Sequence, residues 1–424
     1  MGLIGVIGAG PAGLVAAGRA AERGHSVFVF EKNGFAGKKL RITGKGRCNI
    51  TNNCDVDAMI SNIPGNGKFL YSSLYLFSNE NVISFFENMG LPLKTERGGR
   101  VFPDSDKAKD VADALLRYTS KNRVQLIFNS KVKEVIAENG EITGIKLEDG
   151  TKKSFDAVIL ATGGVSYPGT GSTGEGHKMA EKSGHTVTSL KPSLIPLVIK
   201  EGWVKEMQGL SLKNAAIRIT DKKGHLLYDD FGEMMFTHFG VTGPVILSAS
   251  RHILEYNYKN VFLHIDLKPA LSEEKMDARL QRDFLKYSRK QFKNALDDLL
   301  PNLMIPVIIK LSQIPPEKPV NQISKEERQT LVNLLKNLKC EIVASRPIDE
   351  AIVTAGGVSV KEINPSTMES KIVKGLYFAG EIIDVDAYTG GFNLTIAFST
   401  GYTAGNSVAL LFRYDSATDT NTGE

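Results

Sequence analysis

Three glycine-rich turns, each at the end of a short apolar strand, predict a doubly wound α/β fold of the Rossmann-like type. They follow strands expected near residues 3–7, 157–160 and 376–378. Because the third turn lies more than 200 residues after the second, the sequence also predicts a region inserted between them. That region, residues 192–350, is expected to be β-rich over 192–270 and helical over 271–340.

The composition is that of an ordinary globular protein. Of the 424 residues, 42% are hydrophobic and 23% are charged, and the net charge is +5. These values exclude wholesale disorder, and so small a charge does not require a nucleic-acid partner. Glycine is in excess at 41 residues, which indicates many places where the backbone turns sharply or approaches a ligand.

The remaining bulk features concern cysteine, histidine and apolar runs. Cys48, Cys54 and Cys340 are too few and too scattered for a disulfide framework or a redox dithiol. The seven histidines lack metal-ligand spacing, so no metal is expected. A strand beginning at Leu3 leaves no room for a secretory leader, and no apolar run reaches membrane-helix length. We therefore expect a soluble, cytoplasmic protein with no membrane partner.

Residues 3–31 have the pattern of a strand, a glycine-rich turn, a helix and a second strand. This is the βαβ unit that binds dinucleotides, and its three glycines each have a physical role. Gly8 permits the tight turn, Gly10 lets the backbone approach a pyrophosphate, and Gly13 lets helix and strand pack closely. The spacing therefore predicts a dinucleotide site.

The residues around this turn narrow the choice of nucleotide. The helix that begins with Pro11 and Ala12 offers unpaired N–H groups and a positive dipole end to phosphates. Glu31, 18 residues after Gly13, is placed to accept hydrogen bonds from ribose hydroxyls. Because its charge disfavours a 2′-phosphate, FAD or NAD is expected rather than NADP.

Residues 32–52 are the first of three segments that favour FAD over NAD. Six basic residues and no acid occur between positions 32 and 47, directly after Glu31. We interpret the segment as a loop along the pyrophosphate and flavin; a solvated basic loop is the alternative. The residues expected to contact the cofactor are Lys32, Lys39, Arg41, Arg47 and Asn49.

The other two segments are strand ends. Thr162 and Gly163 follow the strand at 157–160 and resemble the turn that touches FAD in flavoproteins with two dinucleotide-binding domains. Gly380 and Glu381 end the strand near residue 376 and resemble the second FAD motif, in which the acid holds the ribitol. A helix of about 18 residues follows, and its N-terminus would face the pyrimidine edge of the flavin. Its first residues are Gly391, Phe392 and Asn393.

Together these motifs resemble one bacterial family, the NAD(P)/FAD-dependent oxidoreductases that include YhiN-like and BaiN-like flavoproteins and aminoacetone oxidase. The resemblance runs from residue 1 to about residue 411. It rests on four motifs, RITGKGRCNITN, ATGGVSYPGTGSTGEGHKMAEKSGH, MMFTHFGVTGP and FAGEIIDVDAYTGGFNLTIAFSTGYTAG.

The resemblance implies bound FAD in a split FAD-binding domain of the type found in flavoproteins with two dinucleotide domains. The two parts would be residues 1–191 and 351–411, with 192–350 as an inserted substrate or cap region and 412–424 as a tail. In FAD proteins of this order, backbone near Val132 and Lys133 meets the adenine. No second glycine fingerprint follows a strand, so a stably bound nicotinamide cofactor has no support in the sequence.

Several local patterns predict structure rather than chemistry. Asn139-Gly140 predicts a hairpin between strands at 131–137 and 142–147. In the insert, Ser324 and Glu327 form a predicted capping box. The helical leucine stripe that follows it is expected to lie in the core, and it comprises Leu331, Leu334, Leu335 and Leu338.

The catalytic residues are less evident than the cofactor motifs. His238, in the third motif, is the best acid/base candidate, with a structural histidine at a turn as the alternative. Tyr388 is placed to reach the flavin face or to pack. Asp384 and Asp386 would hold flavin or ribitol, or cap a turn. Cys48 is expected to be a packing residue.

We expect an FAD-dependent oxidoreductase of a small molecule that passes a hydride to or from flavin N5. The reaction would be amine or amino-ketone oxidation or reduction of an activated C=C bond, with NAD(P)H or oxygen as a transient redox partner. The alternatives are an FAD-dependent RNA-modifying protein and a flavin-binding sensor without turnover. A cluster in the insert fits either an RNA patch or a solvated helix face, namely Lys286, Arg289, Lys290 and Lys293.

Overall fold

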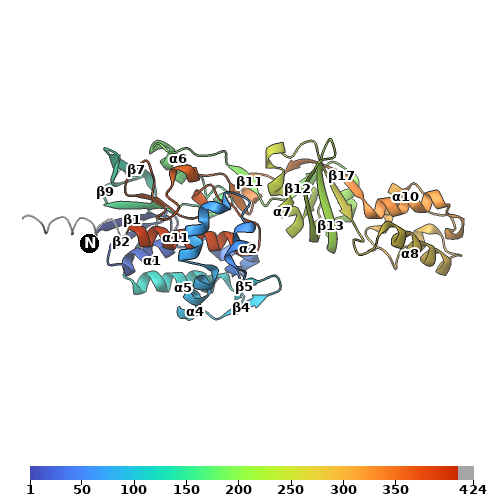
Figure 1. Ribbon diagram of the computed structural model, residues 1–424, viewed down its shortest axis with the longest axis horizontal. Helices are drawn as coiled ribbons and strands as arrows, with labels where there is room; N and C mark the ends of the chain where they lie inside the picture. The colour runs from blue at the N-terminus through green and yellow to red at the C-terminus, as the bar shows by residue number, and fades with distance from the viewer. Residues whose placement is uncertain (409–424) are drawn as a thin grey trace, which may run out of the picture. The chain divides into compact units, whose positions relative to one another are not determined.

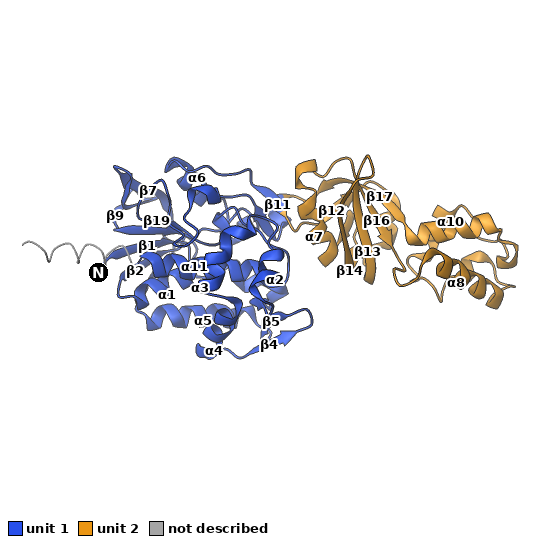
Figure 2. Cartoon of the chain, viewed as in Figure 1, with its two compact units in different colours: residues 1–192, 348–424 blue, residues 193–347 orange. Residues whose placement is uncertain are grey.

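The computed structural model describes residues 1–408 as two compact units (Figures 1 and 2). Unit 1 combines Met1–Pro192 with the chain from Ile348 onward, and unit 2 is Ser193–Pro347. The predicted tail, residues 412–424, and the last three residues of the predicted 351–411 segment lie outside the described residues.

Unit 1 is built on a five-stranded parallel sheet, which confirms the doubly wound α/β prediction. The strand order is β19-β10-β1-β2-β6, so the first strand of the chain is central and the order reverses at it. In such sheets ligands bind outside the carboxyl ends of the strands at this reversal. The strands are β1 (Leu3–Ile7), β2 (Ser26–Phe30), β6 (Gln125–Ile127), β10 (Ala157–Leu160) and β19 (Leu376–Phe378).

Two helices that are distant in sequence pack against each other in unit 1. They are α1 (Pro11–Glu22) and α11 (Phe392–Val408), and α5 (Ala108–Lys121) packs on α1 as well (Figure 1). A Cβ at Gly401 would lie 2.4 Å from the Ala12 carbonyl oxygen, and one at Gly405 would lie 2.3 Å from that of Ala16. Small residues in α11 thus allow the two backbones to touch.

The other strands of unit 1 form small sheets. In one of them β7 (Val132–Glu138) and β8 (Glu141–Leu147) form the predicted hairpin, with positive φ at Asn139 (53°) and Gly140 (80°). The second sheet has the order β3-β5-β4, with β3 at Thr51–Asn52, β4 at Leu93–Glu96 and β5 at Arg100–Pro103. The remaining elements are α2 (Val56–Ser61), α3 (Tyr71–Leu76), α4 (Asn79–Asn88), β9 (Lys152–Ser154), α6 (Glu175–Lys182), β11 (Lys191–Ser193) and β18 (Val353–Ala355).

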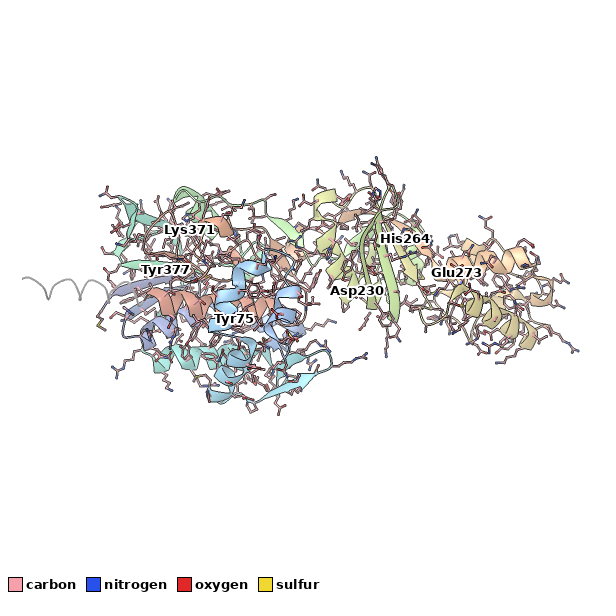
Figure 3. All side chains as sticks on the ribbon, in the orientation of Figure 1. Tyr75, Asp230, His264, Glu273, Lys371 and Tyr377 are labelled. Carbon is pink, nitrogen blue, oxygen red and sulfur yellow. The ribbon has the colours of Figure 1, made fainter. Side chains whose placement is uncertain are left out.

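The core of unit 1 continues up to the ends of these strands. Tyr377 of β19 (Figure 3) is 1% exposed, and burial raises the pKa of its phenol. The strands at the reversal point are buried on both faces, as expected for a parallel sheet covered on each side.

Unit 2 contains a closed barrel followed by helices. The barrel order is β12-β15-β14-β13-β16-β17, with His264 of β16 (Figure 3) bonded to Thr220 and Asn337. Its strands are β12 (Leu197–Ile199), β13 (Ser211–Asp221), β14 (Leu226–Phe236), β15 (Gly240–Thr242), β16 (Val261–Asp266) and β17 (Leu338–Ser345). The helices are α7 (Pro244–His252), α8 (Glu273–Lys286), α9 (Ile305–Ser312) and α10 (Lys325–Lys336).

Two elements of unit 2 depart from the predicted division of the insert into a β-rich part, 192–270, and a helical part, 271–340. Helix α7 lies inside the range predicted to be β-rich, and β17 begins at Leu338, inside the range predicted to be helical. The Ser324–Glu327 capping box is confirmed. Leu331 and Leu335 are buried as predicted, but Leu338 is buried as the first residue of a strand because α10 ends at Lys336.

Within residues 1–408, the structure contains no helix that is both long and apolar enough to span a membrane.

Candidate functional site

The glycine-rich turn lies between β1 and α1, at the reversal point of the sheet. Gly8 has φ +102°, and a Cβ there would lie 2.6 Å from the Ala161 carbonyl oxygen. A Cβ at Gly13 would lie 1.9 Å from the Gly8 carbonyl oxygen, so this position also requires glycine for packing. By contrast, nothing lies within 4 Å of a Cβ placed on Gly10. The turn is therefore tight on its inner side and open above Gly10.

The first turn of α1 adds hydrogen-bond donors to this open face. Pro11 occupies the first helical position, and no side chain caps the helix at Gly10. The N–H groups of the first turn are those that a helix leaves without an intrahelical acceptor. Ala12 is 4% exposed and packs against Gly380, where a Cβ would lie 2.9 Å from the Ala12 Cβ. The arrangement fits an anionic group that approaches the backbone closely.

Glu31 ends β2 at the same edge of the sheet. Its Oε2 accepts a hydrogen bond from the Ala9 N–H at 2.9 Å, and its Oε1 accepts from the backbone N–H and side-chain amide of Asn33 at 2.8 and 2.7 Å. The side chain is 9% exposed. Because a carboxylate oxygen accepts two hydrogen bonds, Oε2 retains capacity for a hydroxyl donor.

Lys39 and Glu381 form a cluster that links four segments of the chain. The Lys39 Nζ donates to Glu381 Oε2 at 2.7 Å and to Ser166 Oγ at 2.6 Å. Glu381 Oε1 accepts from the Ser166 hydroxyl at 3.0 Å and from the Thr354 N–H at 2.9 Å. Burial opposes ionisation of Glu381, but the charge of Lys39 and these hydrogen bonds outweigh it and hold the pKa of the carboxyl below its usual value. The cluster fixes an anion beside the ends of β10 and β19.

The turn after β10 lies next to this cluster. Gly163 has φ +75°, and a Cβ there would lie 3.2 Å from Ser172 Oγ and 4.0 Å from Glu381 Oε2. The hydroxyl oxygen of Thr162 is buried and has no hydrogen-bond partner within residues 1–408. An orphaned buried hydroxyl at this edge is the kind of group that a bound ligand or an ordered water satisfies.

The basic loop after Glu31 is anchored by acids from other segments. Arg47 pairs with Glu96 and Asp106 at 2.5 and 2.6 Å and stacks on Phe102 at 4.2 Å. The two carboxylates raise the pKa of the Arg47 guanidinium. Two more residues of the loop have such partners, Lys32 with Glu175 at 2.6 Å and Arg41 with Asp113 at 3.1 Å.

Asn49 differs from its basic neighbours. Its Oδ1 is buried and has no hydrogen-bond partner in the described part of the chain. Cys48, just before it, is fully buried with φ +61°, and burial raises the pKa of its thiol to about 12. The packing role predicted for Cys48 agrees with this environment.

The segment before α11 is held by its own amides and by α2. The Asn393 side chain bonds to both backbone groups of Ala387 and to the carbonyl of Tyr388, and the Tyr388 N–H donates to the Asn62 carbonyl at 3.0 Å. Asp386 is 1% exposed and forms a backbone bridge with Gly65. Asn393 therefore orients the approach to α11.

Two glycines with positive φ precede α11, and the second approaches the backbone of β3. Gly390 and Gly391 have φ +130° and +99°, and a Cβ on Gly391 would lie 2.3–2.7 Å from backbone atoms of Thr51. Phe392 then opens the helix at 6% exposure. The N-terminus of α11 is thus fixed against the segment that follows Asn49.

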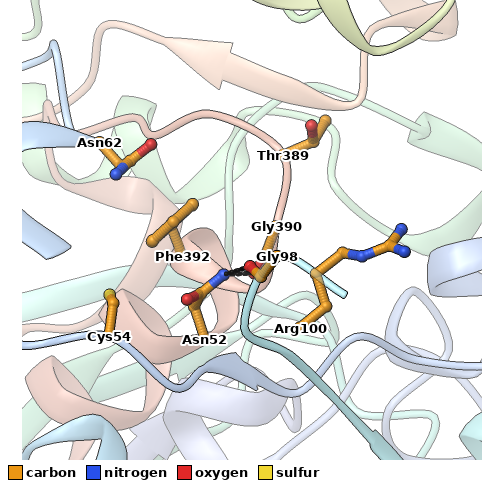
Figure 4. A pocket seen from close by; sticks show the side chains of 8 residues that line it. All are labelled: Asn52, Cys54, Asn62, Gly98, Arg100, Thr389, Gly390 and Phe392. Atoms are coloured by element: carbon orange, nitrogen blue, oxygen red, sulfur yellow. Dashed lines mark hydrogen bonds between the residues drawn. The ribbon is translucent and has the colours of Figure 1, made fainter. Parts of the chain in front are cut away.

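A cavity of about 400 Å³ opens at this junction (Figure 4). It combines amide, thiol, hydroxyl and guanidinium groups with one aromatic ring, and none of its eight lining residues is acidic. They are Asn52, Cys54, Asn62, Gly98, Arg100, Thr389, Gly390 and Phe392. Of these, the sequence analysis named Phe392 as a site residue. The others come from four segments, and three of them, Asn52, Thr389 and Gly390, lie within the quoted motifs without having been singled out.

Two predicted residues are not among those that line the cavity. His238 belongs to unit 2, in the turn between β14 and β15, where it is exposed and its ring centre lies 5.0 Å from that of Phe239. Val132 begins β7 in unit 1 and is 4% exposed. Tyr388, by contrast, directly precedes Thr389 of the cavity.

The residues of unit 1 fit a dinucleotide cofactor that carries a flavin. The open face above Gly10 is a cradle that a side chain would fill, and Glu31 presents a fixed acceptor beside it. The same unit also contains the cavity at α11 and two buried oxygens without hydrogen-bond partners within residues 1–408, those of Asn49 and Thr162. A mononucleotide-sized ligand would leave part of this set unused.

Residues 3–407 match the family model described as HI0933-like protein Rossmann domain. The chain belongs to the HI0933-like family. Its members are Rossmann flavoproteins, and the family resemblance inferred from the four motifs is thereby confirmed. The chain is a flavin-dependent oxidoreductase.

Relatives align over almost their whole length. The chain is 31% identical to 3-dehydro-bile acid delta(4,6)-reductase of Clostridium scindens, over 96% of this chain and 99% of that one. It is 31% identical to the ribosomal RNA dihydrouridine synthase of Haemophilus influenzae, over 95% and 98%, and 29% identical to that of Escherichia coli, over 94% and 95%.

Solved structures show the same fold at low sequence identity. A 3-ketosteroid delta1-dehydrogenase from Sterolibacterium denitrificans superposes with a TM-score of 0.52 at 14% identity, covering 96% of this chain and 99% of that one. Sdh1 of Mycobacterium smegmatis gives a TM-score of 0.52 at 16% identity, covering 99% and 71%. The HI0933-like chain therefore has an FAD-binding Rossmann-like fold with an inserted β-rich region.

Proposed function

We propose that this protein binds FAD and uses it to reduce an activated C=C bond of its substrate. The observation that carries the proposal is the near full-length similarity to a bile acid reductase and to dihydrouridine synthases. Both names describe the addition of hydrogen across a C=C bond, although the substrates differ. Amine or amino-ketone oxidation, the other expectation from the sequence, has no counterpart among these relatives.

The residues that would hold FAD extend from the turn after β1 to α11. Gly8, Gly10 and Gly13 with the first turn of α1 would receive the pyrophosphate, Glu31 would hold the ribose, and backbone at Val132 would meet the adenine. When bound, FAD supplies a carrier that exchanges a hydride with the substrate.

The residues near the flavin end would orient the ring system. Glu381, held by Lys39, lies beside the turn of Thr162 and Gly163 and would bind the ribitol. The unpaired N–H groups of the first turn of α11 would favour negative charge on the reduced ring. Arg47 would act indirectly, because its pairs with Glu96 and Asp106 hold the loop that presents Asn49.

Saturation of a C=C bond needs a proton as well as a hydride. Tyr388 is our preferred proton donor in unit 1, because its neighbour Thr389 lines the cavity. His238 of unit 2 is the other candidate. The variants Tyr388→Phe and His238→Gln separate the two candidates. Loss of the proton donor should slow reoxidation of the reduced flavin by substrate and leave the rate of flavin reduction unchanged, whereas the other variant should change neither rate.

A second candidate substrate is uridine in RNA, since two of the relatives named above act on ribosomal RNA. The predicted basic cluster supports it only in part. Lys286 pairs with Asp298 and Lys293 with Glu317, both at 2.7 Å, whereas Arg289 and Lys290 are exposed. All four residues are exposed, as expected for a solvated face. They do not share one helix, because α8 ends at Lys286 and Lys293 lies in a separate 3-10 helix, Phe292–Asn294.

The test is an anaerobic two-step assay on the purified holoprotein. NADH or NADPH is added until the flavin absorbance bleaches, and then either a conjugated steroid ketone or an unmodified ribosomal RNA transcript is added. Reoxidation together with a product heavier by two hydrogen atoms identifies the substrate class. If neither acceptor nor any other activated alkene restores the absorbance, while oxygen restores it or an amine bleaches the oxidised flavin, the C=C reductase proposal is wrong.

A further inference from the structure

Asn52 is the most constrained polar residue of the cavity at α11. Its side chain is 6% exposed, and its Nδ2 donates to the carbonyl oxygens of Gly98 at 3.0 Å and Gly390 at 3.1 Å (Figure 4). Both partners are acceptors, so the amide must place its nitrogen toward them and its oxygen on the other side. The orientation of the side chain is therefore set by the backbone around it.

The oxygen of this amide lies beside Gly99, where a Cβ would approach it to 2.5 Å. Asn52 lines the cavity, and its Oδ1 accepts no hydrogen bond within residues 1–408. An amide oxygen can accept two hydrogen bonds, so Oδ1 keeps its full capacity for a donor. The residue therefore offers an acceptor that suits an N–H or O–H group of a ligand.

The neighbouring backbone supplies the complementary groups. The Thr51 hydroxyl contacts that of Thr395 in α11 at 2.7 Å, and Gly391 abuts the Thr51 backbone, so β3 and the first turn of α11 form one rigid edge. The first-turn N–H groups of α11 are donors without intrahelical acceptors, and the Asn393 side chain is engaged with Ala387 and Tyr388 instead of capping them. An acceptor thus stands beside a set of donors.

This pattern is complementary to the pyrimidine edge of a flavin, where a ring N–H lies between two carbonyl groups. We propose that Asn52 is a flavin-binding residue, whose Oδ1 accepts a hydrogen bond from N3–H of the isoalloxazine ring while the first turn of α11 donates to an adjacent ring carbonyl. The inference rests on FAD binding and adds a specific residue to it; it does not depend on which bond the enzyme reduces.

The proposal makes recognition of N3–H measurable. FAD methylated at N3 keeps the adenine, ribose and pyrophosphate but cannot donate from that nitrogen. The wild-type apoprotein should bind FAD about tenfold more tightly than the methylated analogue, which corresponds to one lost hydrogen bond. Binding is measured by flavin fluorescence, without turnover.

Two variants of equal size separate the hydrogen bond from the space that the methyl group needs. Asn52→Leu removes the acceptor, and Asn52→Asp keeps it, while both remove the donor to Gly98 and Gly390. The Asp variant should retain the preference for FAD, and the Leu variant should bind both ligands equally. Asn62→Leu, at the other side of the cavity, should leave the preference unchanged.

Two results would overturn the proposal: a wild-type protein with equal affinity for FAD and the analogue, or Leu and Asp variants with the same preference. The wild-type comparison decides the first of these even where a variant fails to fold. Failure of the C=C reductase assay leaves these binding results intact, whereas a protein that binds no FAD removes the basis of both proposals.

Discussion

Gly10→Ala should separate cofactor binding from folding. Gly10 has φ −82° and ψ −178°, which alanine adopts freely, and a Cβ there meets nothing within 4 Å. The apoprotein should therefore lose only the modest preference of glycine over alanine at a helix N-cap, about 1 kcal/mol or less. The added methyl group, however, would occupy the space through which a pyrophosphate reaches the N–H groups of α1.

The magnitude for the cofactor follows from one charge-assisted hydrogen bond. Such a bond contributes about 1.5–3 kcal/mol, so its loss should weaken FAD binding by roughly tenfold to a hundredfold. Gly13→Ala is the matched variant, and its expected effect is on folding stability. Its Cβ would lie 1.9 Å from the Gly8 carbonyl oxygen, where ordinary contact begins at 3.4 Å, so the helix must move by 3.4 − 1.9 = 1.5 Å.

A backbone displacement of this size lies at the upper end of overpacking costs, about 3 kcal/mol. Alanine regains about 1 kcal/mol of helix propensity, which leaves a net loss of about 2 kcal/mol. Chemical denaturation of both apoproteins and FAD titration test the pair. A Gly10→Ala protein that binds FAD as tightly as wild type would refute the assignment of this face to the pyrophosphate.

Two further predictions concern charge and thiols. Lys39→Ala should destabilise the protein by about 1–3 kcal/mol at neutral pH, because Glu381 keeps its charge without its cation. Since the folded-state pKa of Glu381 lies below the ordinary 4.5, its stabilising contribution is complete above pH 4.5 and is lost as the pH falls through the folded value. The difference in unfolding free energy between wild type and variant, measured by chemical denaturation, should therefore disappear in acid. A difference that persists in acid would count against the ion pair. A thiol reagent should label Cys54 before Cys48 and Cys340, because burial raises the pKa of all three thiols but only Cys54 is partly exposed. Saturating FAD should slow the labelling of Cys54 at the cavity. Mass spectrometry identifies the labelled sites, and early labelling of Cys48 would contradict the packing.

The local part of the fold was predictable from sequence. Strands β1 and β10 occupy the ranges expected for them, because each is an apolar run that ends at a glycine-rich turn. The Asn139–Gly140 hairpin followed for a similar reason, since both residues tolerate positive φ. These features depend on neighbours within a few residues.

The barrel of unit 2 was less predictable because its pairing is not local. Strand β14 carries Asp229, Asp230 and Glu233, so it lacks a continuous apolar run, and its pairing with β13 and β15 sustains it. Strand β17 closes the barrel against β12, more than 130 residues earlier in the chain. Leu338 also fits the helical leucine stripe, so the sequence pattern alone does not distinguish helix from strand at this residue. Pairing with other strands of the barrel determines that it is a strand residue.

The site shows the same division. The turn glycines and Glu31 are spaced by the geometry of one βαβ unit, whereas Asn52, Arg100 and Thr389 meet only after three separate segments pack together. No single-sequence pattern links an asparagine in a two-residue strand to a carbonyl 338 residues away. Only the position of Asn52 within the RITGKGRCNITN motif pointed in its direction.

The acidic partners of the basic loop come from other parts of the chain, so the pattern within the loop does not predict them. The segment after Glu31 contains several positive charges and no acid, which predicted that its charges attract the anionic pyrophosphate. In the folded chain those charges meet carboxylates from elsewhere, among them Glu175, Glu381 and Asp113. Much of their charge is therefore already compensated before a ligand arrives, and the pyrophosphate would rely chiefly on the backbone N–H groups of α1. Since paired charges of this kind act as cross-links, the proposed FAD site would use the loop chiefly to hold Asn49 and Asn52 in place.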